Sequence, residues 1–199
     1  MANYLIGIAG PSCSGKGEVA AWLRQQVNAV ELCVDSYYHD QAGIPFEVRV
    51  LNNYDVPEAL DWPLIVRQVS DLRAGQAVEK PVYDFSMHTR AAHTVLFQPA
   101  PVVILDGLFV LHHPEVRAML DLKVFIDAPD EVCLARRTQR DIEQRGRRKE
   151  DILRQFKQQV QPSADKYIRP TKVYADVVLD GTAPVAESGG AVLAMFRSR

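Results

Sequence analysis

Short apolar runs recur along the chain and are separated by stretches with helical spacing. The runs are YLIGIAG (4–10), VELCVD (30–35), PVVILDG (101–107), LKVFIDA (122–128) and ADVVLD (175–180). A continuous run of this length, rich in branched apolar residues, is typical of a strand that is buried on both faces. We therefore predict a core strand at each of these runs.

The stretches between the runs have the period of amphipathic helices. In GEVAAWLRQQV (17–27), the residues Val19, Leu23 and Val27 lie on one stripe. Further helical stretches are predicted at about 57–74, 129–144 and 148–161. Strands that alternate with helices predict an α/β fold, in which helices cover both faces of a parallel sheet.

One segment breaks this alternation. The sequence AVEKPVYDFSMHTRAAHTVLFQPAP (77–101) has two extended arms around a polar turn. It predicts an antiparallel β-hairpin at about 77–98, inserted between a helix and the next core strand. An insertion outside the main sheet is a candidate for an element that covers the substrate.

Composition and charge fit one globular unit. The chain has 199 residues, of which 47% are hydrophobic and 24% are charged, so we expect a single domain over residues 1–199. The tail TAPVAESGGAVLAMFRSR (182–199) contains a pair of glycines, and we expect it to form only a weak helix that frays. The formal net charge of −2 provides no global attraction for a nucleic-acid polymer or an anionic membrane.

Cysteine content and apolar run lengths indicate the expected location. Cys13, Cys33 and Cys133 form neither a C-x-x-C motif nor an even set for disulfides. The start MANYLIGIAG lacks the basic region of a signal peptide, and no run approaches the roughly 20 apolar residues of a membrane helix. We expect a soluble protein of the reducing cytoplasm.

The segment GIAGPSCSGKGEVA (7–20) resembles a phosphate-binding loop. Its spacing fits G-x-x-x-x-G-K after an apolar run and before a helix, which favours a P-loop NTPase-type sheet over a chance match. Backbone N–H groups and the helix dipole attract phosphate oxygens, and the lysine adds a positive charge. The candidate nucleotide-binding residues are Gly10, Ser12, Ser14, Gly15, Lys16 and Gly17.

The loop lacks one residue that normally meets the magnesium ion. Gly17 stands where a Ser or Thr hydroxyl is usual, although a water molecule could take that place at some cost in affinity. Asp106 ends an apolar run and is our candidate for a second acidic group at the ion. The alternative for Asp106 is a turn-forming Asp-Gly pair after a strand.

Several further segments, together with this loop, resemble the uridine kinase (uridine-cytidine kinase) family. They are VDSYYHD (34–40), NYDVPEALDWPLI (53–65), PVYDFSMHTR (81–90), VVILDGLFVLHHPEVRAMLDLKVFIDA (102–128), RRTQRDIEQRGR (136–147) and DKYIRPTKVYADVVL (165–179). The segments follow the order of the family and cover most of the chain from residue 4 to about 180. The resemblance implies phosphorylation of the 5′-hydroxyl of uridine and cytidine by ATP or GTP with Mg²⁺. In the family this reaction belongs to pyrimidine salvage, and the enzyme is usually a homotetramer.

Two aspartates near the predicted strand ends have expected roles in this reaction. A carboxylate at Asp35 could take the proton of the attacking hydroxyl, and the resemblance assigns it as the base; the alternative is a cap for the turn that follows. Asp55 precedes Pro57 and could cap a helix that begins there. The resemblance instead directs Asp55 to the ribose hydroxyls.

Aromatic and imidazole side chains are interleaved with polar residues in the hairpin. Tyr83, Phe85 and His88 could stack on a base or bind its edge, although a lone His on a hairpin is more often a surface residue. By resemblance, Tyr83 and His88 read the pyrimidine, and Tyr38 is another residue of the nucleoside site.

Six arginines and no lysine lie within 13 residues. This composition indicates either a solvated helix face or a mobile lid over phosphates at about 136–150. The arginines are Arg136, Arg137, Arg140, Arg145, Arg147 and Arg148. By resemblance, Arg137 and Gln155 reach toward the nucleoside. The expected phosphate clamps, which with Lys16 and Asp35 make up the catalytic set, are Arg140, Arg145 and Arg147.

The chain departs from the family on the magnesium side. The family has Ser or Thr at Gly17, usually Glu at Asp106, and often Ser or Thr at Glu18. Our hypothesis is a working kinase with weakened metal-nucleotide affinity. The alternatives are a catalytically silent nucleoside sensor and a related kinase for another alcohol such as nicotinamide riboside, pantothenate or ribulose phosphate.

Overall fold

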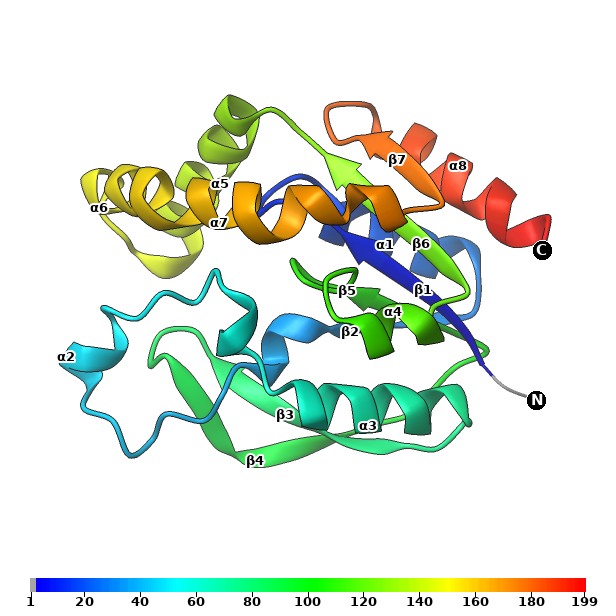
Figure 1. The fold of residues 1–199 in the computed structure, drawn as a ribbon, viewed down its shortest axis with the longest axis horizontal. Helices are drawn as coiled ribbons and strands as arrows, with labels where there is room; N and C mark the ends of the chain where they lie inside the picture. The colour runs from blue at the N-terminus through cyan, green and yellow to red at the C-terminus, as the bar shows by residue number, and fades with distance from the viewer. Residues whose placement is uncertain (1–2) are drawn as a thin grey trace.

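The computed structural model describes residues 3–199, and five parallel strands form its centre. They are β1 (Tyr4–Ala9), β2 (Ala29–Cys33), β5 (Val102–Asp106), β6 (Leu122–Asp127) and β7 (Val177–Asp180). The strand order is β2-β5-β1-β6-β7, so β1 lies in the middle (Figure 1). The predicted α/β fold with a parallel sheet is confirmed, and each predicted run overlaps one of the strands.

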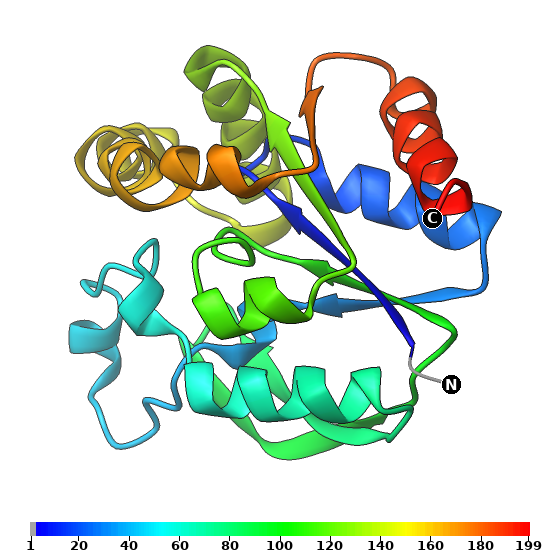
Figure 2. The same ribbon diagram turned by 45° about the vertical axis from the view of Figure 1, so that its right-hand side comes forward.

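Helices cover both faces of this sheet (Figures 1 and 2). The α-helices are α1 (Lys16–Gln26), α2 (Phe46–Arg49), α3 (Trp62–Arg73), α4 (Pro114–Met119), α5 (Asp130–Arg145), α6 (Lys149–Gln155), α7 (Gln161–Ser163) and α8 (Val185–Arg197). Successive side chains of β1 point to opposite faces. Leu5 packs in the apolar cluster that includes α3, whereas Ile6 and Ile8 pack in the cluster with α1 and α8.

The predicted helix at about 57–74 begins later than expected. Pro57–Ala59 form one 3₁₀ turn, and α3 begins at Trp62. Asp61 caps α3, because its side chain accepts a hydrogen bond from the Leu64 N–H at 3.2 Å. Helix capping by Asp55, one of the two roles that the sequence allowed for this residue, is therefore absent.

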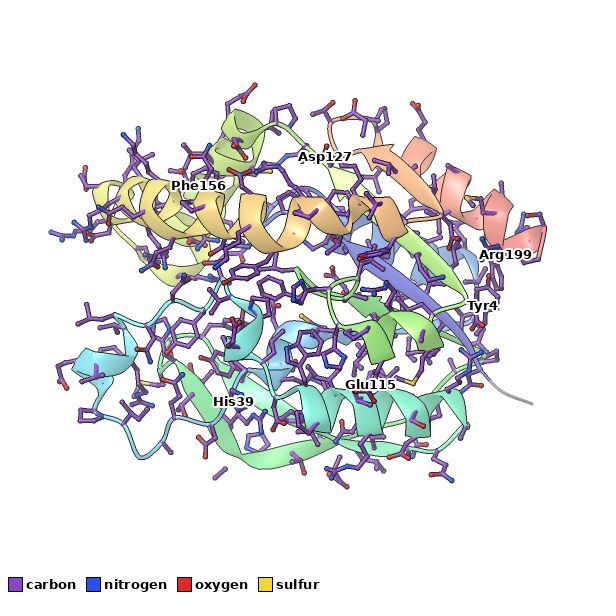
Figure 3. All side chains as sticks on the ribbon, in the orientation of Figure 1. Tyr4, His39, Glu115, Asp127, Phe156 and Arg199 are labelled. Carbon is purple, nitrogen blue, oxygen red and sulfur yellow. The ribbon has the colours of Figure 1, made fainter. Side chains whose placement is uncertain are left out.

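The predicted helix at about 148–161 is the first part of a longer helical rod. The chain continues from α6 through π-helical turns at Phe156–Val160 and Ala164–Ile168 and a 3₁₀ segment at Arg169–Tyr174. Phe156 packs against Cys133 of α5 in a separate apolar cluster, which joins the rod to α5 (Figure 3). A short sequence period does not reveal this extension, because π-turns change the spacing of the buried residues.

The predicted β-hairpin is present. Strands β3 (Val78–Asp84) and β4 (Thr89–Phe97) pair antiparallel, with an irregularity between Pro81 and Tyr83. They form a sheet of their own beneath α3 (Figure 1). His88 lies in the turn and adopts a positive φ of 52°, which is uncommon for a residue with a side chain.

The expectation of a weak, frayed C-terminal helix is wrong. Helix α8 runs from Val185 to Arg197 beside α1 (Figure 2), with Val192 fully buried. A Cβ atom at Gly189 would lie 2.3 Å from the Trp22 ring, so the glycine permits the close contact with α1. Gly189, one of the two glycines from which we expected fraying, therefore serves the packing of α8 on α1.

Two further expectations concern location. Within residues 3–199, no helix is both long enough and apolar enough to span a bilayer. Cys13, Cys33 and Cys133 all carry free thiols.

The central strands should dominate stability. Val103 on β5 is fully buried, so Val103→Ala should lower the free energy of unfolding by about 2 kcal/mol through lost burial and a residual cavity. Val178 on the edge strand β7 is 47% exposed and provides the matched control, with an expected change within about 0.5 kcal/mol. Urea unfolding of both variants tests this prediction, and equal decreases in the free energy of unfolding would contradict it.

Candidate active site

The cleft lies where the parallel strands end. In the β2–β5 register, Cys33 pairs with Asp106, so Asp35 follows β2 close to the last residue of β5. The phosphate loop follows β1, the strand on the other side of β5. A cavity of about 750 Å³ opens at this edge, a volume typical of sites for small ligands.

The phosphate loop has the backbone that such a loop needs. Gly15 has a φ of 107°, Cys13 has a positive φ of 63°, and α1 begins at Lys16. The Lys16 ammonium donates to the Pro11 carbonyl at 2.8 Å across the loop and lines the cavity. Free N–H groups and the start of α1 are therefore directed toward an anion-binding position.

The expected nucleotide-binding residues divide into two groups. Ser12, Gly15, Lys16 and Gly17 line the cavity, whereas Gly10 and Ser14 do not. A Cβ atom at Gly10 would lie 2.1 Å from the Ile126 carbonyl oxygen, so Gly10 serves the close approach of β1 and β6. The Ser14 hydroxyl is buried and has no hydrogen-bond partner in the structure.

Gly17 and Asp106 face each other at the loop. A Cβ atom at Gly17 would lie 3.7 Å from Asp106 Oδ2, and Asp106 Oδ1 is buried without a hydrogen-bond partner. Within residues 3–199, no group of three acidic, His or Cys side chains forms a metal cluster. Mg²⁺ is usually held by one or two carboxylates together with phosphates and water, so Asp106 fits a magnesium ion that arrives with a nucleotide.

Asp35 has the environment of a base. It lies in the 3₁₀ turn Val34–Tyr37, whose N-cap is Cys33 rather than Asp35, and it lines the cavity. Burial raises the pKa of Asp35, and the positive charge of Lys16 partly offsets this effect. Burial likewise raises the pKa of Asp106 to about 7.

Asp55 is buried and also lines the cavity. Burial raises its pKa, and the charge of Arg137 opposes that rise. Only the backbone N–H of Asp55 has a hydrogen bond, to Asn53 Oδ1 at 3.0 Å. Its carboxylate therefore remains available to a polar ligand.

An aromatic cluster forms the hairpin side of the cavity. The Tyr38 and Tyr83 ring centroids are 5.1 Å apart, and Phe85 packs edge-on against Tyr83 at 5.1 Å. Tyr54 stacks on His88 at 5.2 Å, a contact that sequence analysis did not anticipate although Tyr54 precedes Asp55. Burial and the nearby arginines lower the pKa of His88, so its ring is neutral and can both donate and accept a hydrogen bond.

The arginines of residues 136–150 separate into different roles. Arg137, Arg140, Arg145 and Arg147 line the cavity, as does Gln155. Arg136 also lines it, but donates to the Gly181 carbonyl at 2.9 Å.

Arg148 lies apart from the site. It pairs with Asp151 and is not among the cavity residues, so it does not join the clamp. The other expected residues meet around one cavity, except Gly10 and Ser14 behind the loop.

Comparison with known proteins gives a consistent result. A family model described as the phosphoribulokinase/uridine kinase family matches residues 5–186. The uridine kinase of Ligilactobacillus salivarius is 42% identical over 178 residues, which are 88% of this chain and 84% of that protein. The uridine kinase of Vibrio campbellii is 41% identical over 182 residues, or 88% of this chain and 85% of that protein.

Solved structures share the fold. A possible uridine kinase from Bacillus stearothermophilus superimposes with a TM-score of 0.64 at 21% identity and covers 90% of each chain. Phosphoribulokinase from Rhodobacter spheroides gives a TM-score of 0.64 at 15% identity, over 92% of this chain and 74% of that one. At these identities the superpositions show the fold alone.

The acidic site predicts a pH dependence of stability. The pKa of Asp106 is about 7 in the folded protein against 3.8 as the ordinary value, so the folded state retains a proton that the unfolded state loses. Stability should therefore fall as the pH rises from about 4 to 7 in EDTA. In Asp106→Asn this decline should be smaller.

Urea unfolding in EDTA at several pH values between 4 and 8 measures this difference. Asp71→Asn on α3 is the control, because Asp71 does not line the cavity, and it should retain the decline of the natural protein. If the stability of Asp106→Asn declined with pH as much as that of the natural protein, the pH dependence could not be assigned to Asp106.

Proposed function

The chain belongs to the phosphoribulokinase/uridine kinase family, and we propose that it transfers the γ-phosphoryl group of ATP or GTP to the 5′-hydroxyl of uridine or cytidine. One observation carries this proposal: the phosphate loop, Asp35 and the Tyr83–His88 side of the hairpin line the same cavity. A donor site and an acceptor site thus share one space, with a carboxylate at that space.

On the donor side, the chain offers backbone N–H groups and cations to a triphosphate. Lys16 lies at the start of α1, and Arg140, Arg145 and Arg147 line the same cavity. Guanidinium groups bind phosphate oxygens through paired hydrogen bonds and balance the charge that develops during phosphoryl transfer. Asp106 would hold a magnesium ion that arrives with the nucleotide, and the ion would supply positive charge that balances the charge of the phosphates.

On the acceptor side, Asp35 removes the proton of the attacking hydroxyl. Its raised pKa brings it closer to the operating pH, which favours proton transfer in the transition state. Asp55 would accept hydrogen bonds from the ribose diol. The neutral ring of His88 and the hydroxyl of Tyr83, which is buried without a partner, would bind the edge of the base. We expect Arg137 and Gln155 to complete the nucleoside side, with Tyr38 and Phe85 adding apolar contact.

The alternatives differ in what they leave unexplained. A silent nucleoside sensor accounts for Gly17, but not for the unpartnered Oδ1 of Asp106 and the carboxylate of Asp35 in the same cavity as the loop. A kinase for another small alcohol does not account for the aromatic hairpin side of the cavity. A screen of acceptors distinguishes such a kinase from a uridine or cytidine kinase. The homotetramer and the cytoplasmic location remain predictions from the family resemblance.

The proposal predicts a raised magnesium requirement. Gly17→Thr should restore a hydroxyl ligand, because the added Cβ meets Asp106 Oδ2 at an ordinary contact distance of 3.7 Å. We expect the Mg²⁺ concentration for half-maximal turnover with uridine to fall about tenfold. A steady-state assay of ADP release, with magnesium titrated from micromolar to tens of millimolar, measures this.

Two controls accompany that titration. Gly190→Thr on α8, where an added Cβ meets nothing within 4 Å, should leave the magnesium requirement unchanged. Asp35→Asn sets the background rate without the base. Turnover of the natural protein equal to that background at saturating magnesium and ATP would refute the kinase. Calorimetric binding of uridine without turnover in Gly17→Thr would then favour the sensor.

A further inference from the structure

A fully buried carboxylate lies at the centre of the arginine cluster. Asp141, on the last turns of α5, has a side-chain exposure of 0%. A buried charge is costly unless it is paired, and a partner can be identified for each of its oxygens. No role in the proposed reaction has been given to Asp141 so far.

Four guanidinium groups surround this carboxylate. Arg140 donates to Oδ1 through both Nε, at 3.0 Å, and Nη2, at 2.8 Å. Arg145 Nη1 lies 3.5 Å from the same oxygen. Arg147 Nη1 donates to Oδ2 at 3.2 Å, and Arg137 Nε lies 3.7 Å from Oδ2.

The backbone of Asp141 holds the same cluster. Gly146 adopts a left-handed φ of 61° and ends α5, which turns the chain back on itself. The Arg147 N–H then donates to the Asp141 carbonyl at 3.0 Å. Arg147 is therefore fixed by Asp141 twice, once through its main chain and once through its side chain.

The arginines face the cavity, whereas the aspartate does not. All four arginines line the cavity, and Asp141 is absent from its lining. Asp141 is thus behind the guanidinium groups and can affect a ligand only through them. Gln155 is a second anchor, since its Oε1 accepts from Arg147 at 2.7 Å and from Arg137 at 3.3 Å, but it carries no charge.

Charge balance explains why a carboxylate is needed among these four arginines. Four guanidinium groups gathered around one carboxylate repel one another, and that carboxylate offsets one of their four charges. Burial alone would raise the pKa of Asp141, but the arginines, Arg140 foremost, outweigh burial and lower it. The carboxylate therefore stays ionised, and a net charge of +3 remains toward the cavity.

We propose that Asp141 is a positioning residue, which holds Arg140, Arg145 and Arg147 in the arrangement that receives the triphosphate of the donor. This inference rests on the proposed function. The ion pairs that hold the arginines are made within the chain itself, by Asp141. The arginines then need little rearrangement to bind phosphate, which is the advantage of a preorganised electrostatic site.

Two substitutions of Asp141 distinguish a role in positioning the arginines from a role through its charge alone. Asp141→Asn keeps the size of the side chain and removes its charge, whereas Asp141→Glu keeps the charge and displaces it by one methylene group. A role through charge alone predicts that Asn tightens ATP binding, because the cavity gains positive charge, and that Glu behaves as the natural protein. A positioning role predicts that both variants lose function.

The expected result follows from that difference. Both variants should lower kcat on the order of a hundredfold, the usual effect of misplaced transition-state contacts. The KM for uridine should change less than about threefold, since Asp55, Tyr83 and His88 are retained. Both should also weaken ATP binding, measured by calorimetry without an acceptor.

A matched control comes from the neighbouring helix. Asp151 on α6 also pairs with two arginines, Arg148 and Arg154, but none of these three lines the cavity. Asp151→Asn should leave both kcat and ATP affinity unchanged. Thermal unfolding and circular dichroism establish that each variant is folded before it is assayed.

A double-mutant cycle tests the route through the arginines. In an Arg140→Gln background, Asp141→Asn should reduce kcat by a clearly smaller factor than in the natural protein, because the partner is already gone. An equal factor in both backgrounds, tighter ATP binding in Asp141→Asn, or natural behaviour of Asp141→Glu would each overturn the inference.

The failure of the proposed function would be a separate outcome. If the natural protein phosphorylated no acceptor, the kinase proposal would fail, but the ATP affinities would still decide the role of Asp141. Weaker ATP binding in both Asp141 variants supports positioning, and unchanged binding in both overturns it.

Discussion

The parallel register of the central strands determines where every polar group of the cleft lies. Because β2, β5 and β1 run in one direction, their carboxyl ends meet at one edge, and Asp35, Asp106 and the phosphate loop are placed there together. A shift of one residue would turn the buried side chains of a strand to its other face. The apolar clusters on the two faces of the sheet thus fix the positions of the groups that line the cavity.

The charges that line the cleft differ from what the net charge of the whole chain suggests. The net charge is −2, yet the cavity is lined by Lys16 and several arginines as well as by Asp35, Asp55 and Asp106. Burial raises the pKa of each of these three acids. The protein therefore creates its anion-binding field locally, which matches a small phosphorylated ligand better than a polymer.

The sequence predicted the features that depend on local pattern. Continuous apolar runs revealed the strands, and the glycine spacing located the phosphate loop before α1. It could not show that Asp61 rather than Asp55 caps a helix, because both precede proline-containing turns. The arginine-rich composition alone did not distinguish Arg147 from its neighbour Arg148. The family resemblance did so, and the structure gives the physical reason, which is the left-handed turn at Gly146 between α5 and these two residues. The role of Asp141 was hidden for a similar reason, as four partners on both sides of that turn meet only in three dimensions.

In the proposed function, one cavity brings a triphosphate to a nucleoside hydroxyl. Phosphorus NMR of the products from ATP and uridine tests this proposal, because the chemical shift and proton coupling identify the phosphorylated oxygen. We expect a monoester at the 5′ position and no product from 5′-deoxyuridine. A product phosphorylated elsewhere on the ribose, or equal turnover of 5′-deoxyuridine, would contradict it.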